Sequence, residues 1–206
     1  MCGIAGILYR YSESNQKLNW DEFLKELQNI VLARVDIENP PNEAVSALEE
    51  KVSSLKEYQA FSTIWNNTEL ASQLQKAADS ILEFEKHSKE CILNSKNPLP
   101  TNLVENWNSL GVRLRDIAWT ISQDVLGNIG RVRLILPDFV KAASLDAWKI
   151  TAVLNNMDRL EVRGRDSLGI SVSLHFSSSQ SFEDFCATIT RAGLEEEFTK
   201  RLKCPT

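Results

Sequence analysis

Apolar residues recur every three or four positions through most of residues 20–127, which is the spacing of one face of an α-helix. Prolines at 40–41 and 98–100 interrupt this pattern, because proline cannot continue the helical hydrogen-bond ladder. Asn67 or Thr68 is expected to cap the third helix. The predicted helices span about 20–35, 43–65, 68–93 and 101–127. Four such amphipathic helices predict an antiparallel bundle. Four tryptophans are expected to anchor its core: Trp65, Trp107, Trp119 and Trp148.

The pattern is less regular after residue 127. Residues 130–137 fit either a strand or the end of a helix, and a short helix is expected to follow through Ala143. Ser144 is a favourable N-cap for a longer helix that ends near Leu160. Ser181 should cap a last helix, whose apolar face is rich in phenylalanine.

Two short segments have the pattern of strands instead. Residues 4–8 form a nearly continuous apolar run, which is typical of a buried strand. Residues 170–176 alternate between apolar and polar side chains, which indicates a strand with one buried face. Together with the helices, these segments predict a fold of the α+β class.

The composition is that of a globular protein and argues against several classes of function. Hydrophobic residues make up 43% of the 206 residues and charged residues 25%, and the net charge of −5 argues against a broad nucleic-acid surface. There is no apolar run of about 18 residues and no secretory signal pattern, so we expect a cytoplasmic protein that does not bind membranes. The cysteines and histidines lack metal-site spacing, so we expect free thiols, no metal and no cofactor. These residues are Cys2, Cys91, Cys186, Cys204, His87 and His175.

The first candidate for chemistry is Cys2, which follows the initiator methionine. Removal of Met1 is expected before a side chain as small as cysteine, and it would give Cys2 a free α-amine. That amine, with an ordinary pKa of about 8, can serve as a base for the thiol of the same residue. Gly3 and Gly6 leave room for close approach to the thiol. The alternative is an ordinary start codon followed by a first core strand.

A second motif joins this one. Residues 160–170 read Leu-Glu-Val-Arg-Gly-Arg-Asp-Ser-Leu-Gly-Ile. With the opening Cys2-Gly3-Ile4-Ala5-Gly6, the segment resembles the class II glutamine amidotransferases, which are N-terminal-nucleophile (Ntn) hydrolases with an αββα fold. The form of the motif is most similar to the amidotransferase half of glutamine–fructose-6-phosphate aminotransferase. Asparagine synthetases, a second branch, more often have Arg-Gly-Pro-Asp at this point.

The resemblance implies a mechanism and a donor substrate. The Cys2 thiolate would attack the side-chain amide of glutamine, the α-amine would move the proton, and water would hydrolyse the resulting thioester. Arg163 and Asp166 would organise the loop beside the thiol, and the arginine would favour the thiolate. The same loop contains Gly164, Ser167 and Gly169, and Gly3 lies beside the nucleophile. The alternative for Arg163 and Asp166 is a surface ion pair in a tight turn.

The resemblance covers only residues 1–10 and 144–176, so it also implies a domain organisation. We expect residues 1–15 and 144–206 to form a partial Ntn-hydrolase (αββα) core. Residues 16–143 would be a mostly α-helical bundle inserted in a loop, which chain entropy tolerates well.

The chain departs from the family after residue 176. No Thr-Arg-Trp-like carboxylate clamp and no Asn-Gly pair for the oxyanion follow, so we expect the chain to be incomplete for catalysis. Loss of oxyanion donors costs a rate factor of about a hundred to a thousand. The expected acceptor is a sugar phosphate such as fructose 6-phosphate, held by a downstream domain, with a homo-oligomer as the assembly. The alternatives are an asparagine-synthetase-type enzyme, a helical interaction or regulatory module with an inactive amidotransferase start, and a first strand that merely braces the bundle.

Overall fold

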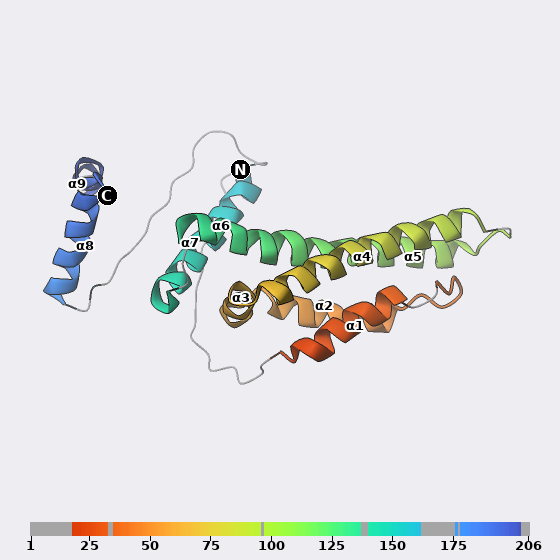
Figure 1. Cartoon of the computed structure of the whole chain (residues 1–206). Coiled ribbons are helices and arrows are strands. Elements are labelled where there is room, and N and C mark those ends of the chain that lie inside the picture. The colour runs from red at the N-terminus through yellow and green to blue at the C-terminus, as the bar shows by residue number, and fades with distance from the viewer. Residues whose placement is uncertain are drawn as a thin grey trace. The chain divides into compact units, whose positions relative to one another are not determined.

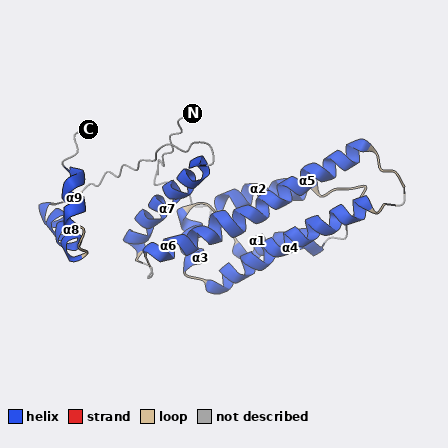
Figure 2. Cartoon of the chain, turned by 90° about the horizontal axis from the view of Figure 1, so that it is seen from above, coloured by secondary structure: helices blue, strands red, loops and turns tan. Residues whose placement is uncertain are grey.

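Helices make up every regular element in the part of the chain that the computed structural model describes (Figure 2). The described residues are 18–32, 35–95, 97–136, 140–161, 176 and 178–202. The chain divides into two units, Met1–Arg165 and Asp166–Thr206. The predicted helical content is therefore confirmed. The described ranges contain no strand and so supply no sheet of an αββα core; both predicted strands lie outside them, apart from Phe176.

Four helices of the first unit form a bundle (Figure 1). They are α1 (Trp20–Leu32), α2 (Asn42–Ser54), α4 (Thr68–Leu93) and α5 (Thr101–Trp119). Helix α4 packs against α1 and α5, and α2 packs against the same two helices from the opposite side of the core. The predicted bundle is confirmed.

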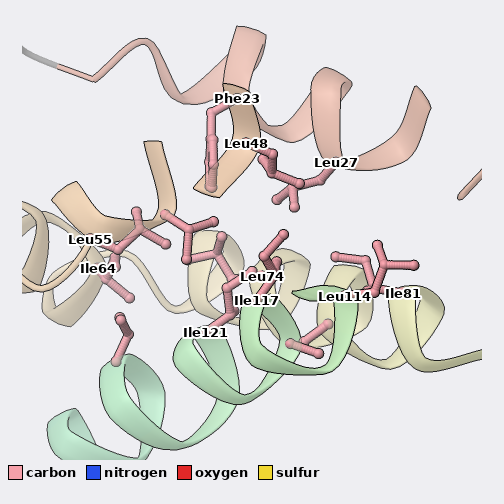
Figure 3. Packing of buried hydrophobic residues seen from close by; sticks show 14 of the residues in the cluster. Phe23, Leu27, Leu48, Leu55, Ile64, Leu74, Ile81, Leu114, Ile117 and Ile121 are labelled. Atoms are coloured by element: carbon pink, nitrogen blue, oxygen red, sulfur yellow. The ribbon is translucent and has the colours of Figure 1, made fainter. Parts of the chain in front are cut away.

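The bundle core consists mainly of aliphatic side chains from all four helices, together with aromatic ones such as Phe23 (Figure 3). Its fully buried members include Leu27, Leu48, Leu74, Ile81 and Leu114. Each such side chain contributes about 1.5–3 kcal/mol when it leaves water. The three-and-four spacing in the sequence exists because these residues share the inward face of each helix.

The second predicted helix, 43–65, is wrong as a single element. The structure divides it into α2 and α3 (Tyr58–Trp65), with a turn at residues 55–57. The Ser54 hydroxyl donates to the carbonyl of Lys51 at 2.6 Å, and such side-chain bonds compete with the helical ladder. Glu57 then adopts an extended conformation before α3 begins. By contrast, the predicted cap of α4 is confirmed, because Asn67 Oδ1 accepts from the Leu70 amide at 3.0 Å.

The fourth predicted helix does not end near Gly127. Helix α5 continues through a π-helix, η1 (Thr120–Gly127), into α6 (Asn128–Ile135). Gly127 keeps a helical conformation, and the buried Val125, Ile129 and Val132 continue the helical spacing past it. The strand alternative for residues 130–136 is therefore wrong.

Helix α7 (Lys141–Glu161) starts before the predicted cap. Ser144 lies inside its first turn, and its amide donates to the Val140 carbonyl at 2.7 Å. The Ser144 hydroxyl is fully buried and lies 2.8 Å from the Tyr58 hydroxyl. Ser144 thus joins α7 to α3 and does not cap α7. The first three residues of the short helix predicted before Ser144, 137–139, lie outside the described residues, and residues 141–143 belong to α7.

The four predicted tryptophan anchors have different outcomes. Trp65 and Trp107 are buried, and the indole N–H of Trp107 donates to the Ile37 carbonyl at 2.8 Å. Trp148 is half-buried against the core. Trp119 is 60% exposed, so the prediction for it is wrong. It lies on the outer face of α5, one position beyond the buried Ala118.

The second unit contains α8 (Ser179–Arg191) and α9 (Glu195–Leu202). The cap of α8 is Ser178, whose hydroxyl accepts from the Ser181 amide at 3.1 Å, so the predicted cap is three residues too late. Gly193, with φ +70°, reverses the chain between the two helices and divides the predicted last helix. The Phe185 ring of α8 meets the Phe198 ring of α9 edge-on at 5.6 Å, and the Phe176 ring, which precedes α8, packs against Phe182 and Phe185.

Candidate functional site

The predicted catalytic residues lie outside the described part of the chain. They are Cys2, Gly3, Arg163, Gly164, Asp166, Ser167 and Gly169. Their roles stay predictions that follow from the resemblance. The described residues nevertheless include the helix that leads to the second motif and a polar cavity beside that helix.

Helix α7 extends to Glu161, shortly before the motif at 163–169. Ring contacts and hydrogen bonds hold it against the other helices of the first unit. The Tyr58 ring meets the Trp148 ring edge-on, with 5.9 Å between centroids. About two helical turns further along α7, Asn155 Nδ2 donates to Asn128 Oδ1 at 3.0 Å. The Arg131 guanidinium donates to the same Asn155 side chain. The start of α7 is therefore fixed on α3 and its middle on α6.

A cavity of about 140 Å³ lies where these elements meet. Its apolar wall includes Phe61 and Trp148, and its polar wall includes Lys56, Asp124 and Asn128. The Lys56 ammonium lies 3.0 Å from Asp124 Oδ2. The Asp124 side chain is 15% exposed, whereas the Lys56 side chain is 51% exposed. The acid is thus the inner member of the ion pair and the base is the outer one.

The π-helix forms one wall of this cavity. Asp124 and Val125 belong to η1, and Asn128, which is 93% buried, is the first residue of α6. A π-helix is rare in proteins and occurs frequently at functional sites, where its wide turn displaces side chains from their α-helical positions. No sequence motif marks this cavity, because its residues come from segments up to a hundred positions apart.

A second groove, of about 470 Å³, lies between α1 and α4. Its floor is apolar and includes Leu27 and Val31, and its edge is formed by Gln28, Gln73 and Lys76. The groove contains no acidic, histidine or cysteine side chain among its described lining residues, so it offers a surface for packing rather than a site for chemistry.

The remaining reactive side chains of the described ranges do not gather at a cavity. Cys91 Sγ lies 3.6 Å from His87 Nε2 on the last turns of α4, at the surface, and neither residue lines a cavity described above. Cys91 and Cys186 are free thiols. Within the described part of the chain there is no group of three or more His, Cys, Asp or Glu side chains that could hold a metal ion.

The best-formed surface ion pair joins α2 to α5. Arg113 Nε donates to Glu49 Oε1 at 2.9 Å, and Arg113 Nη2 donates to Glu49 Oε2 at 2.7 Å. These hydrogen bonds lower the pKa of the Glu49 carboxyl and raise the pKa of the Arg113 guanidinium. The pair lies on the outside of the bundle, so it bears on stability and not on catalysis.

Comparison with known proteins finds no match to this chain among family models, curated proteins or solved structures. None of the described helices is long and apolar enough to cross a membrane.

Proposed function

We propose that this chain is the glutaminase segment of a glutamine-dependent amidotransferase, in which Cys2 is the N-terminal nucleophile that releases ammonia from glutamine. The observation that carries the proposal is the pair of motifs, Cys2–Gly6 and Arg163–Gly169. Helix α7 supports it, because it ends at Glu161 and so leads into the second motif, as the resemblance implies.

The proposed reaction needs a nucleophile, a base and a proton donor. The Cys2 thiolate adds to the amide carbon of glutamine, and the α-amine takes the thiol proton and returns it to the departing ammonia. Water then attacks the thioester carbon, which releases glutamate and regenerates the thiol. The arginine of the second motif, Arg163, favours the thiolate electrostatically, and Asp166 orients the loop.

The proposed acceptor of the ammonia is a sugar phosphate such as fructose 6-phosphate. The form of the second motif, with Arg165 rather than proline between Gly164 and Asp166, supports this branch over the asparagine-synthetase type. The two branches predict different products, an amino sugar phosphate and asparagine, and product analysis with both acceptors separates them.

The test is chemical and uses the full chain. Intact-mass measurement should show loss of Met1, and a glutamine-like electrophile should add once, at Cys2. The control is a Cys91→Ala, Cys186→Ala variant, which removes both free thiols of the described part and should still be labelled. Retention of Met1, or labelling that persists in Cys2→Ala, contradicts the proposal.

A second candidate is a helical interaction or regulatory module with an inactive amidotransferase start. The bundle core favours it, because α1–α6 share one continuous apolar cluster that also includes Ala147 of α7. On this reading Cys2→Ala changes no activity. Glutamine hydrolysis by the purified chain, lost in Cys2→Ala, excludes it.

A further inference from the structure

The cavity between α3, η1, α6 and α7 has an unusual distribution of charge. It holds one cation, Lys56, and one anion, Asp124, and the remaining polar lining residues, Asn128 and Asn155, are neutral amides. Trp148 adds an aromatic wall. A cavity lined by one charge of each sign and by two neutral amides suits a ligand that is itself neutral overall and charged at both ends.

We propose that this cavity binds a small zwitterion, an α-amino acid with a short side chain. The residues that carry this inference are not those that carry the proposed glutaminase activity, so the inference goes beyond that activity and does not depend on it. No covalent step is involved.

The ion pair sets the orientation of the ligand. The ligand ammonium meets the inner Asp124 carboxylate, and the ligand carboxylate meets the outer Lys56 ammonium. Opening the existing Lys56–Asp124 contact does not leave the mostly buried carboxylate unpaired, because the ligand ammonium takes the place of the Lys56 ammonium. The bound zwitterion replaces that one pair by two charge-assisted hydrogen bonds, which are stronger than neutral ones.

The size of the cavity limits the side chain. A cavity of about 150 Å³ accommodates a molecule as large as benzene, which has six non-hydrogen atoms. The 140 Å³ here match the size of alanine, which has six non-hydrogen atoms, and serine, which has seven, is the next larger candidate. Ala152 and Val125 line the apolar part, where a methyl or hydroxymethyl group would lie. For ligands of this size an affinity on the order of 0.1–1 mM is expected.

The experiment is calorimetric titration of the full chain with L-alanine and L-serine, compared with propionate and ethylamine, which each carry only one of the two charges. Both amino acids should bind, and each one-charge analogue should bind at least about tenfold more weakly. Asp124→Asn and Lys56→Met should each weaken alanine binding about tenfold or more. The matched control is Lys51→Met, which removes an ion pair with Glu26 on the outside of the bundle and should leave binding unchanged.

A second variant covers the case in which Asp124→Asn does not fold. Ala152→Leu fills the cavity with apolar atoms while it leaves the Lys56–Asp124 pair in place, and it should abolish binding. Cys2→Ala should bind alanine normally, which separates this site from the proposed nucleophile. Absence of heat with either amino acid up to about 10 mM overturns the proposal. Equal binding of propionate and alanine, or equal loss in Lys51→Met, also overturns it.

Discussion

Two leucines on α4 allow a direct test of the bundle core. Leu74 is 0% exposed and packs in the apolar cluster, whereas Leu82, eight positions further along the same helix, is 44% exposed. Truncation of either side chain to alanine removes the same atoms from the same helix. The two substitutions therefore differ in burial and hardly at all in helix propensity.

The magnitudes follow from burial. For Leu74→Ala, removal of three buried carbons costs about 2.4 kcal/mol at about 0.8 kcal/mol each, and the cavity left behind adds to this. We expect a loss of about 3–4 kcal/mol in the free energy of unfolding. For Leu82→Ala, nearly half of the side chain is already in water, and alanine favours the helix slightly, so we expect about 1 kcal/mol or less.

Urea unfolding followed by far-ultraviolet circular dichroism measures both values. The slope of the free energy against urea should stay equal to that of the wild type, so that the shift in midpoint reports stability. If the two variants differ by less than about 0.5 kcal/mol, the inward face assigned to α4 is wrong.

Three further predictions concern charge, capping and backbone conformation. The pKa of Glu49 is held below its ordinary 4.5 by Arg113, so the pair stabilises the fold above that pH and its contribution disappears as the pH falls through the lowered value. Glu49→Gln should therefore cost no more than about 1 kcal/mol near neutrality, and the difference from the wild type should vanish in urea titrations at acidic pH. Asn67→Ala should cost about 1 kcal/mol through loss of the α4 cap, and equal urea midpoints for variant and wild type would contradict this. Gly193→Ala should cost about 1–2 kcal/mol and speed amide exchange in α8 and α9, since Gly193 has φ +70°. Gly130→Ala, where open space surrounds the added methyl in a helix, should instead stabilise by about 0.5–1 kcal/mol, and destabilisation there would be inconsistent with α6.

The sequence predicts those features of the fold that depend on neighbours along the chain. The start of α4 is an example, because Asn67 caps it through an amide only three residues away. The break between α2 and α3 cannot be seen in the pattern, since Leu55 within the turn and Phe61 beyond it are both buried and preserve an apparent helical spacing. Serine is a residue type that favours N-caps, but the role of Ser144 is decided by the hydroxyl of Tyr58, 86 positions away in the sequence.

The candidate sites divide in the same way. The motifs around Cys2 and Arg163 can be recognised from the order of residues in the sequence, and their geometry stays a prediction. The cavity beside Lys56 and Asp124, by contrast, can be recognised only from the structure. Its polar members are ordinary surface-type residues in the sequence, and only the packing of α7 against α3 and α6 brings them to one place.

The uninterrupted run of α5, η1 and α6 also has a consequence for how this gene can vary. Thr101–Ile135 is one rod whose first part faces the bundle and whose last part faces α7. Each residue of a helix turns the following ones by about 100°, so a single deletion within the rod would swing Val132 away from the core. Substitutions on the outer surface of this rod should cost little stability, whereas a change in its length by even one residue should disrupt the packing of its last part. Insertions and deletions should therefore be far rarer between 101 and 135 than in the connection that precedes them.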